Sequence, residues 1–135
     1  MNTTTSIKPK RGFKKKTQPQ IKRETHIIDA ADRILGRLAT EIAVLLRGKQ
    51  KIGFAPYKDI GDFVLVKNAD KIKFTGKKLD QKKYYSHSSY IGSSKEKPLK
   101  ELFSEDPAEV LKRAVFGMLP KNKLRAEMIK RLKFE

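Results

Sequence analysis

One stretch of the sequence repeats its apolar residues with the period of an α-helix, and this stretch most restricts the fold. Its apolar residues recur at the spacing i, i+3, i+4, i+7 and i+11, namely at Leu35, Leu38, Ala39, Ile42 and Leu46. Residues at this spacing share one face of a helix, so that face packs against a core. Gly48 follows at the position where a glycine with positive φ commonly ends a helix. We therefore predict a core-packed helix that ends near residue 47.

Short runs of β-branched and aromatic residues surround this helix in the sequence. Ile27 and Ile28 precede it, residues 63–66 follow it, and two further extended runs lie near 72–74 and within 82–92. Runs of this length and composition are typical of strands. Strands that alternate with a helix in this way indicate an α/β layer fold.

Two helices are predicted in the C-terminal third of the chain. Asp106 occupies the position of an N-cap, Pro107 that of the first helical residue, and Glu109 completes a capping box. The buried stripe of this helix consists of Leu111, Ala114, Val115, Met118 and Leu119. We expect Pro120 to stop it. A final helix is predicted to start near Asn122, with an apolar stripe of Leu124, Met128 and Leu132.

The chain carries far more positive than negative charge. Its 135 residues include 32 Lys and Arg against 15 Asp and Glu, which gives a net charge of +17 at pH 7. Such a surplus repels itself in a folded body unless a polyanion neutralises it. The longest purely apolar run, residues 42–46, is far shorter than the roughly 20 residues that cross a bilayer. We therefore expect a polyanionic partner and no membrane partner.

We divide the chain into a basic, flexible N-terminal arm at residues 1–24 and a single α/β domain at residues 25–135. The arm has few sizeable apolar groups, so it should be flexible when free. Its cations suit contact with RNA phosphates and are Lys8, Lys10, Arg11, Lys14, Lys15 and Lys16. Two alternatives stay open for the arm, a merely soluble tail and an organelle-targeting leader, because residues 1–23 contain no acid.

The usual patterns of catalytic and metal-binding sites are missing from the sequence. There is no cysteine, which excludes thiolate sites and fits an intracellular compartment, and His26 and His87 lack partners at metal spacing. Serines flank His87, but no G-x-S-x-G elbow is present. The stretch TGKK at 75–78 lacks the other residues of a nucleotide phosphate loop. We predict no catalytic residue, no metal, no cofactor and no small-molecule substrate.

Several motifs that support these predictions also carry a resemblance to a known family. They include LGRLAT at 35–40, LRGK at 46–49, TGKK at 75–78 and GMLPKN at 117–122. With them, residues 27–133 resemble ribosomal protein thirteen of the large subunit, of the universal, bacterial or organellar type. The resemblance implies a three-layer α/β/α domain with a small, mainly parallel central sheet of about four strands. It also implies binding to large-subunit ribosomal RNA beside neighbouring ribosomal proteins, with early entry into assembly.

The sequence departs from that family's pattern at a few positions. Ser89 and Ser93 stand where glycines are usual, and Arg125 and Ala126 stand where Gly-Arg is usual. The basic arm before Glu24 is also longer or more basic than is usual, so RNA contacts could have moved between the two ends of the chain.

Within the domain, we expect RNA contacts from three clusters of side chains. The first surrounds the last interhelix turn and comprises Lys121, Asn122, Lys123, Arg125, Lys130 and Arg131. The second belongs to the first helix and its end and comprises Arg37, Arg47, Lys49 and Lys51. The third mixes cations with aromatic residues and comprises Lys77, Lys78, Lys82, Lys83, Tyr85, His87, Tyr90 and Lys95. Cations neutralise phosphates and tyrosine rings stack on unpaired bases, whereas the alternative is a solvated basic surface.

The sequence thus predicts a structural constituent of the large ribosomal subunit, located in a cytoplasmic or an organellar ribosome. It would bind ribosomal RNA mainly through phosphate backbone and shape, and it would not be an enzyme. The alternative is a free RNA-binding translational regulator that uses the same surface on messenger RNA. A third class, a small nucleotide-dependent enzyme, lacks a recognisable nucleotide motif.

Overall fold

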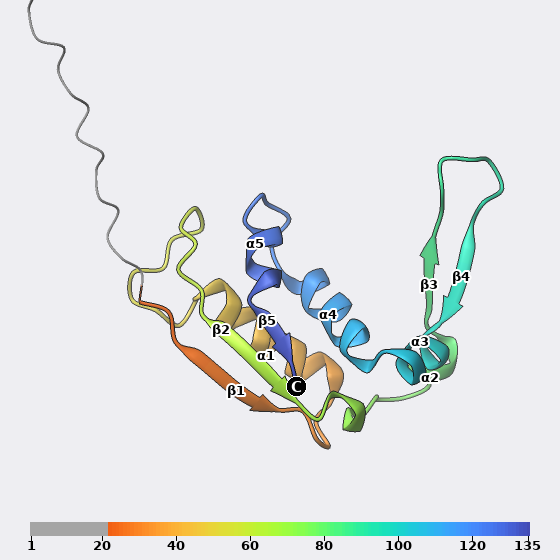
Figure 1. The fold of residues 1–135 in the computed structure, drawn as a ribbon, viewed down its shortest axis with the longest axis horizontal. Coiled ribbons are helices and arrows are strands. Elements are labelled where there is room, and N and C mark those ends of the chain that lie inside the picture. Colours follow the sequence, from red (N-terminus) through yellow and green to blue (C-terminus); the bar gives the residue numbers. More distant parts are fainter. Residues whose placement is uncertain (1–21) are drawn as a thin grey trace, which may run out of the picture.

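A computed structural model gives the fold of residues 22–135 (Figure 1). The six cations of the arm that we predict to contact RNA, from Lys8 to Lys16, lie outside these described residues. Within residues 22–135 the first regular element is a strand, as the sequence predicts, and strands and helices follow it. None of the helices in the described part of the chain is long and apolar enough to span a membrane.

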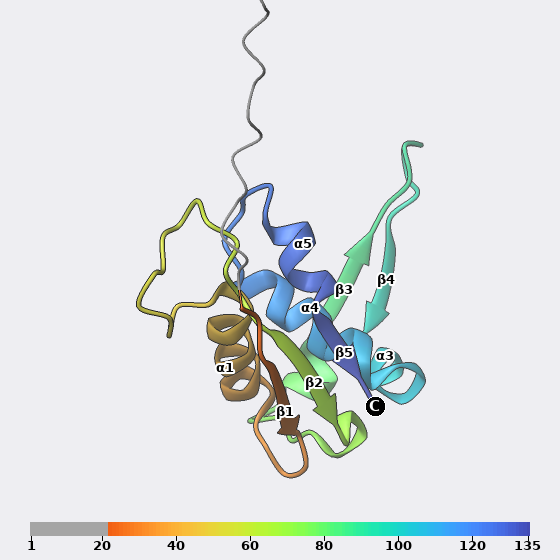
Figure 2. The ribbon, with the colours of Figure 1, turned by 60° about the vertical axis from the view of Figure 1, so that its left-hand side comes forward.

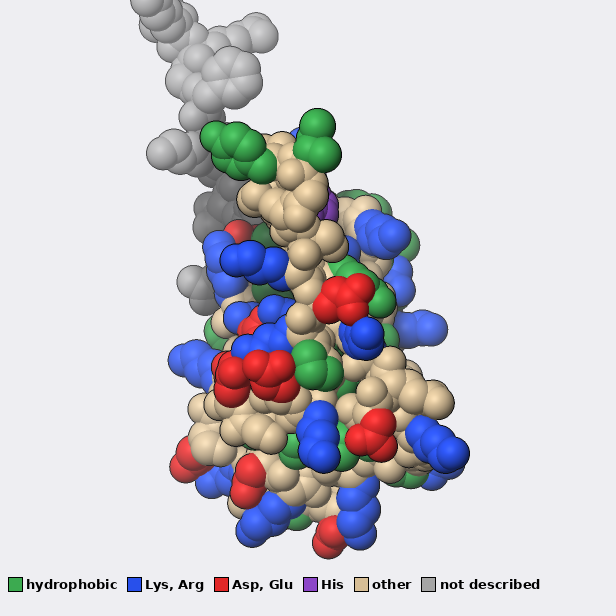
Figure 3. All heavy atoms as spheres, turned by 90° about the vertical axis from the view of Figure 1, so that its right-hand side faces the viewer, with side chains coloured by type: hydrophobic (Ala, Val, Ile, Leu, Met, Phe, Trp, Pro, Cys, Tyr) green, Lys and Arg blue, Asp and Glu red, His purple; other side chains and the backbone are tan. Residues whose placement is uncertain are grey.

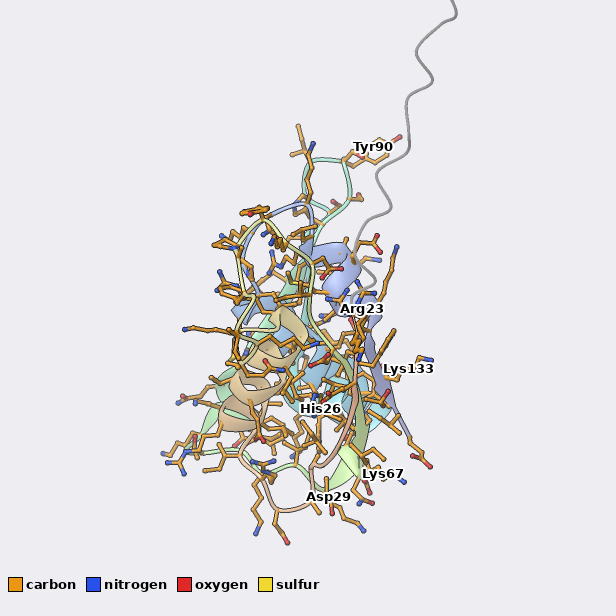
Figure 4. All side chains as sticks on the ribbon, turned by 90° about the vertical axis from the view of Figure 1, so that its left-hand side faces the viewer. Arg23, His26, Asp29, Lys67, Tyr90 and Lys133 are labelled. Carbon is orange, nitrogen blue, oxygen red and sulfur yellow. The ribbon has the colours of Figure 1, made fainter. Side chains whose placement is uncertain are left out.

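Three parallel strands form the centre of the fold. They are β1 (Thr25–Asp29), β2 (Phe63–Lys67) and β5 (Leu132–Phe134), with β2 in the middle. Side chains alternate between the two faces of a strand, so Ile28, Val64 and Val66 share one face and are buried. The opposite face is more open to solvent, because Ile27 is 65% exposed there. Figure 4 shows the helices on one side of the sheet and Lys67 and Lys133 directed away from them.

The first helix forms where the apolar stripe predicts it. Helix α1 (Leu35–Arg47) buries its predicted stripe completely from Leu38 onward, and Gly48 ends it with φ of 75°. The amide of Gly48 donates to the carbonyls of Val44 and Leu45, which satisfies groups at the helix end. The local signals of the sequence were therefore sufficient to set both the face and the end of this helix.

The N-cap predicted in the C-terminal third is confirmed, whereas the amide of Asp106 donates to the carbonyl of Leu102, and Glu109 pairs with Arg113 instead of completing the capping box. Helix α4 (Pro107–Met118) starts after Asp106, whose carboxylate accepts a hydrogen bond of 3.1 Å from the amide of Glu109. Helices α1 and α4 pack on each other and on the sheet, and Leu111 and Val115 of α4 join the residues of α1 in the main core.

The end of the chain differs from the prediction of one long final helix. Helix α5 (Arg125–Lys130) is short, and Leu132 belongs to strand β5, where it lies opposite Val64 of β2. The apolar spacing that suggested a continuous helix arises because Met128 and Leu132 both reach the core from different elements. The backbone continues instead as the third strand, since the amide of Val64 donates to the carbonyl of Arg131.

The α/β class and the mainly parallel sheet are confirmed, but in the described residues this sheet has three strands rather than about four. The run near 72–74 makes only an isolated bridge, between Ile34 and Lys73. The extended run within 82–92 contributes β3 (Lys83–Ser86), which pairs with β4 (Lys95–Pro98) as a separate antiparallel hairpin. The runs near 72–74 and within 82–92, which we expected as strands, therefore do not belong to the central sheet.

Three short elements were not predicted. They are the 3-10 helix η1 (Ala69–Lys71) and the helices α2 (Lys78–Gln81) and α3 (Leu99–Glu105). Leu99 and Leu102 of α3 form a second buried cluster with Val110 of α4, and Phe103 packs edge-on against Phe74 with ring centroids 5.0 Å apart. This cluster anchors the base of the β3–β4 hairpin, which projects away from the body (Figure 1).

Candidate nucleic-acid interface

Three loops lie on the same side of the molecule, beyond the amino ends of β1 and β2. They are the loop 48–62, the turn 119–124 between α4 and α5, and the tip of the β3–β4 hairpin at 87–94, as Figures 1 and 2 show from two directions. Each loop carries side chains from one of the three predicted clusters. The fold therefore brings parts of all three clusters to one side, although they are far apart in the sequence.

The loop 48–62 is tied to the body by the buried carboxylate of Asp62, which is only 1% exposed. Asp62 accepts hydrogen bonds from the amide of Glu24 at 3.0 Å and from the side chain of Gln50 at 3.0 Å. His26 Nε2 lies 3.2 Å from it, and Lys51 forms an ion pair with it. Burial alone would raise the pKa of Asp62, but the hydrogen bonds from Lys51, Glu24 and His26 outweigh burial and hold the pKa below its ordinary value.

The cations of the second cluster therefore differ in how accessible they are. Lys51 is occupied by Asp62 and also donates to the carbonyl of Lys22. Arg47 is half-buried, and its guanidinium carbon lies 5.1 Å from the ring centroid of Phe54. Lys49 is exposed. Among the predicted cations at the end of α1, Lys49 is therefore the one best placed to meet a phosphate.

Arg131 lies inside the protein, not on the predicted surface. It is only 5% exposed, and its guanidinium donates to both carboxylate oxygens of Asp59 and to the carbonyl of Leu46. Arg23 pairs with the same carboxylate at 3.1 Å. The sequence pattern could not reveal this role, because Asp59 and Arg131 are 72 positions apart.

The turn between α4 and α5 divides its polar residues into two groups. Asn122 and Arg125 hold the turn, since Asn122 Oδ1 accepts from the amide of Arg125 at 3.1 Å and Arg125 Nε donates to the carbonyl of Phe116 at 2.8 Å. Lys121 and Lys123 are exposed and make no ion pair with a described residue. Lys130 is exposed farther along α5 and pairs with Glu127 at 3.0 Å. Lys121 and Lys123 are therefore free to contact phosphates.

The β3–β4 hairpin presents aromatic and apolar side chains to solvent, both on strand β3 and at its tip. Tyr85 is 68% and Tyr90 is 83% exposed, and Ile91 beside Tyr90 is fully exposed. Figure 3 shows hydrophobic side chains at the end of this hairpin, above a body covered by charges of both signs. Exposed aromatic rings can stack on unpaired bases. His87, whose Nδ1 lies 3.2 Å from the carbonyl of Ser88, belongs to the same loop.

The cations of the third cluster have several arrangements, and Lys95 lies beside the tip, opposite Ser86. Lys83 pairs with Glu96 at 2.9 Å, and this hydrogen bond raises the pKa of Lys83. Lys95 and Lys77 are exposed. Two further predicted residues, Lys78 and Lys82, line a cavity between α1, α2 and α4 together with Arg37. These three do not belong to the side that carries the loops.

The described residues contain no cluster of three or more side chains suited to hold a metal ion.

The family model of Ribosomal protein L13 matches residues 23–134. The chain belongs to this family. A large ribosomal subunit protein uL13 from Nitratidesulfovibrio vulgaris is 56% identical over 117 residues, which cover 87% of this chain and 81% of that protein. A protein of the same name from Helicobacter hepaticus is 52% identical, and the match covers 87% of this chain and 82% of that protein. Another from Thermobifida fusca is 53% identical, and the match covers 84% of this chain and 76% of that protein.

Two of the positions at which this L13-family chain departs from the expected motif have structural roles. The hydroxyl of Ser93 accepts from the amide of Ser88 at 3.0 Å and so closes the hairpin loop across five residues. The guanidinium carbon of Arg125 lies 3.5 Å from the ring centroid of Phe116, and this cation–π contact adds to its hydrogen bond with the carbonyl of that residue. These substitutions therefore supply contacts within the two loops that carry them.

Proposed function

We propose that this protein is a structural constituent of the large ribosomal subunit and works in the cytoplasm as part of the ribosome. The observation that carries the proposal is the match of residues 23–134 to the family of Ribosomal protein L13, together with bacterial relatives named large ribosomal subunit protein uL13. Neighbouring ribosomal proteins and large-subunit ribosomal RNA are its partners in this proposal. It binds and holds RNA and catalyses no reaction.

The side that carries the three loops is proposed to meet the RNA. Lys49, Lys121, Lys123 and Lys95 are exposed there and can neutralise phosphates, while Tyr85 and Tyr90 can stack on unpaired bases. Side chains that are occupied inside the protein, such as Lys51 and Arg131, stabilise the loops that present these contacts. Recognition would then depend mainly on phosphate positions and RNA shape, with few contacts to base edges.

The arm at residues 1–24 and the domain at residues 25–135 are proposed to bind two segments of the same RNA. Six cations between residues 8 and 16 give the arm a high charge density for such contact. A protein that holds two RNA segments at once reduces the freedom of the RNA, which would favour early steps of subunit assembly.

A direct test measures the binding of the full chain to large-subunit ribosomal RNA at several salt concentrations. If the six cations of the arm and the four on the loops each contact one phosphate, the logarithm of the binding constant should fall with the logarithm of salt concentration with a slope near −0.9 or −0.7 per contact. In a cell lysate at moderate salt, nearly all the protein should sediment with large subunits. A mostly free pool that binds messenger RNA would contradict the proposal and favour a regulator.

A further inference from the structure

A cavity of about 740 Å³ lies between the start of α1, helix α2 and the second half of α4. This volume falls within the roughly 300–1,000 Å³ that small-molecule pockets occupy. The apolar side chains that line it include Leu35, Phe74, Leu99 and Met118. The cavity is thus large enough for one nucleotide-sized group and has apolar walls.

Four cations line the same cavity, and no acidic side chain does so. They are Arg37, Lys78, Lys82 and Arg113. All four are exposed, whereas Leu99 is fully buried and Leu35 and Phe74 are half-buried, so the cations lie at the mouth and the apolar groups line the interior. This arrangement is complementary to a ligand that combines a flat apolar body with negative charge.

Tyr84 holds two of these cations in place. Lys82 Nζ lies 5.2 Å and the Arg113 guanidinium carbon lies 5.0 Å from the centroid of its ring, both within the range of cation–π attraction. Arg113 also donates to Glu109 at 2.9 Å. The two cations are therefore positioned at the mouth before any ligand arrives.

Two glycines leave part of the cavity wall without side chains. A Cβ atom placed on Gly36 of α1 or Gly117 of α4 would meet no atom within 4 Å, apart from its own chain neighbours and helix backbone. Glycine weakens a helix by roughly 1 kcal/mol relative to alanine. Each glycine therefore lowers the stability of its helix and borders open space that a larger side chain would fill.

We propose that this cavity binds one unpaired nucleotide of RNA, with the base against the apolar walls and the neighbouring phosphates at the four cations. The proposal deepens the RNA binding proposed above and rests on it. A nucleotide within an RNA chain suits the site better than a free nucleotide, because the described residues offer no metal-ligand cluster and the glycine-rich phosphate loop is absent from the sequence. An RNA nucleotide also suits the site better than an acidic peptide does, because a flat base can contact the apolar walls, whereas peptide carboxylates cannot.

The first test fills the cavity in the full-length protein. Gly117→Leu places a side chain in the open space and favours the helix, so the variant should fold at least as well as the natural protein. We expect it to bind large-subunit ribosomal RNA about tenfold more weakly, since stacking of one base contributes that order of affinity. Ser104→Leu adds the same side chain to an exposed position of α3 that does not line the cavity, and it serves as the control, with affinity within about twofold.

The second test removes one cation from the mouth. Arg113→Gln should reduce the salt slope of RNA binding by about one phosphate contact, or 0.7 to 0.9. Lys112→Gln is a close control, because Lys112 is the neighbouring cation, lies near the same Glu109 and does not line the cavity. We expect Lys112→Gln to leave the slope unchanged.

A crosslinking experiment identifies the ligand directly. Ultraviolet irradiation of the natural protein with large-subunit ribosomal RNA should produce a nucleotide adduct on the peptide that contains Phe74, and Gly117→Leu should abolish it. AMP should compete only at concentrations far above those of the RNA. Competition by poly-glutamate as strong as by RNA, or by micromolar AMP, would overturn the assignment to an RNA nucleotide.

The outcomes separate the cavity from the broader function. If the natural protein binds ribosomal RNA but folded Gly117→Leu and Arg113→Gln bind it equally well, with the Phe74 adduct intact, the cavity is not a nucleotide site while the proposed function stands. If the natural protein does not bind ribosomal RNA at all, the proposed function fails and the cavity proposal fails with it.

Discussion

The guanidinium of Arg131 donates hydrogen bonds of 2.7 and 2.6 Å to the two carboxylate oxygens of Asp59. A third hydrogen bond, of 3.0 Å, reaches the carbonyl of Leu46 near the end of α1. Arg131 directly precedes β5, and Asp59 belongs to the loop that leads into β2. One side chain therefore joins the end of a helix, a long loop and the last strand, and it stabilises the side of the molecule that we propose to meet RNA.

Loss of the Asp59–Arg131 pair should destabilise the whole domain. Because Arg131 is buried, Asp59→Asn would leave its positive charge poorly compensated, and we expect the free energy of unfolding to fall by about 2–4 kcal/mol. Urea unfolding at pH 7 measures this change. Lys130→Gln, which removes an exposed neighbouring cation, should change the free energy of unfolding by less than about 0.5 kcal/mol. Equal stability of the two variants would show that the buried pair contributes little.

Gly61 should not tolerate any side chain. A Cβ atom at this position would lie 1.7 Å from the carbonyl oxygen of Leu46 and 2.5 Å from its carbonyl carbon, and both are backbone atoms at the end of α1. Gly61→Ala should therefore force the loop off the helix and cost about 3 kcal/mol or more in the free energy of unfolding. Gly53→Ala, in the same loop, has open space around its Cβ and should change stability by less than about 0.5 kcal/mol. Thermal unfolding followed by circular dichroism distinguishes the two outcomes.

The carboxylate of Asp62 should make stability depend on pH in the acidic range. Its pKa in the folded protein lies below the ordinary value of 3.8, because hydrogen bonds to the charged form outweigh the effect of burial. The carboxylate therefore contributes its full stabilisation above about pH 4, and this contribution is lost as the pH falls through the lower folded-state pKa. Acidification should weaken the natural protein in that window.

The variant Asp62→Asn isolates this effect. At pH 7 it should lower the free energy of unfolding by about 2–4 kcal/mol, because Lys51 and the amide of Glu24 lose a charged partner. The difference between the natural protein and the variant should be nearly the same at pH 5 as at pH 7, and it should shrink as guanidinium unfolding is repeated at pH 4, 3 and 2. A difference that stays constant below pH 4 would mean that the charge of Asp62 does not stabilise the fold.

The sequence predicted the elements whose signals are local. The stripe of α1, the αL glycine at position 48 and the capping residue Asp106 act within one or two turns of the helix that they define. Leu132 was assigned to the wrong element because its strand exists only through pairing with β2, which lies far away in the sequence. Short helices such as α3 depend on burial of Leu99 and Leu102 against α4 rather than on a long periodic pattern.

The same distinction applies to the candidate site. Basic clusters were visible in the sequence, but their availability depends on partners that only the fold brings near, as with Lys51 and Asp62 or Arg131 and Asp59. Arg113 was not predicted as an RNA contact, since it lies in an amphipathic helix with an acidic neighbour one turn away. Its place at the cavity mouth follows from the packing of α4 beside α1 and α2.

Removal of the arm should weaken RNA binding without unfolding the domain. The truncation should end at residue 21, because Arg23 pairs with Asp59 and Lys22 accepts a hydrogen bond from Lys51. Six of the cations that we propose to contact phosphates lie in the deleted segment, so the salt slope of RNA binding should become shallower by up to about 4–5. The unfolding temperature of the truncated protein should stay within a few degrees of the full chain, as calorimetry can check. A large drop in that temperature would mean that the arm belongs to the folded core.

Neutralising the turn between α4 and α5 should affect RNA binding alone. The double change Lys121→Gln and Lys123→Gln removes two exposed cations that make no ion pair with a described residue, so the unfolding temperature should not change. The salt slope of binding to large-subunit ribosomal RNA should fall by about 1.4–1.8, which corresponds to two phosphate contacts. Lys71→Gln with Lys133→Gln removes equal charge from η1 and from the open face of the sheet, away from the three loops (Figures 1 and 4). If both double variants reduce the slope equally, the effect depends on net charge, and the loops have no special part in binding RNA.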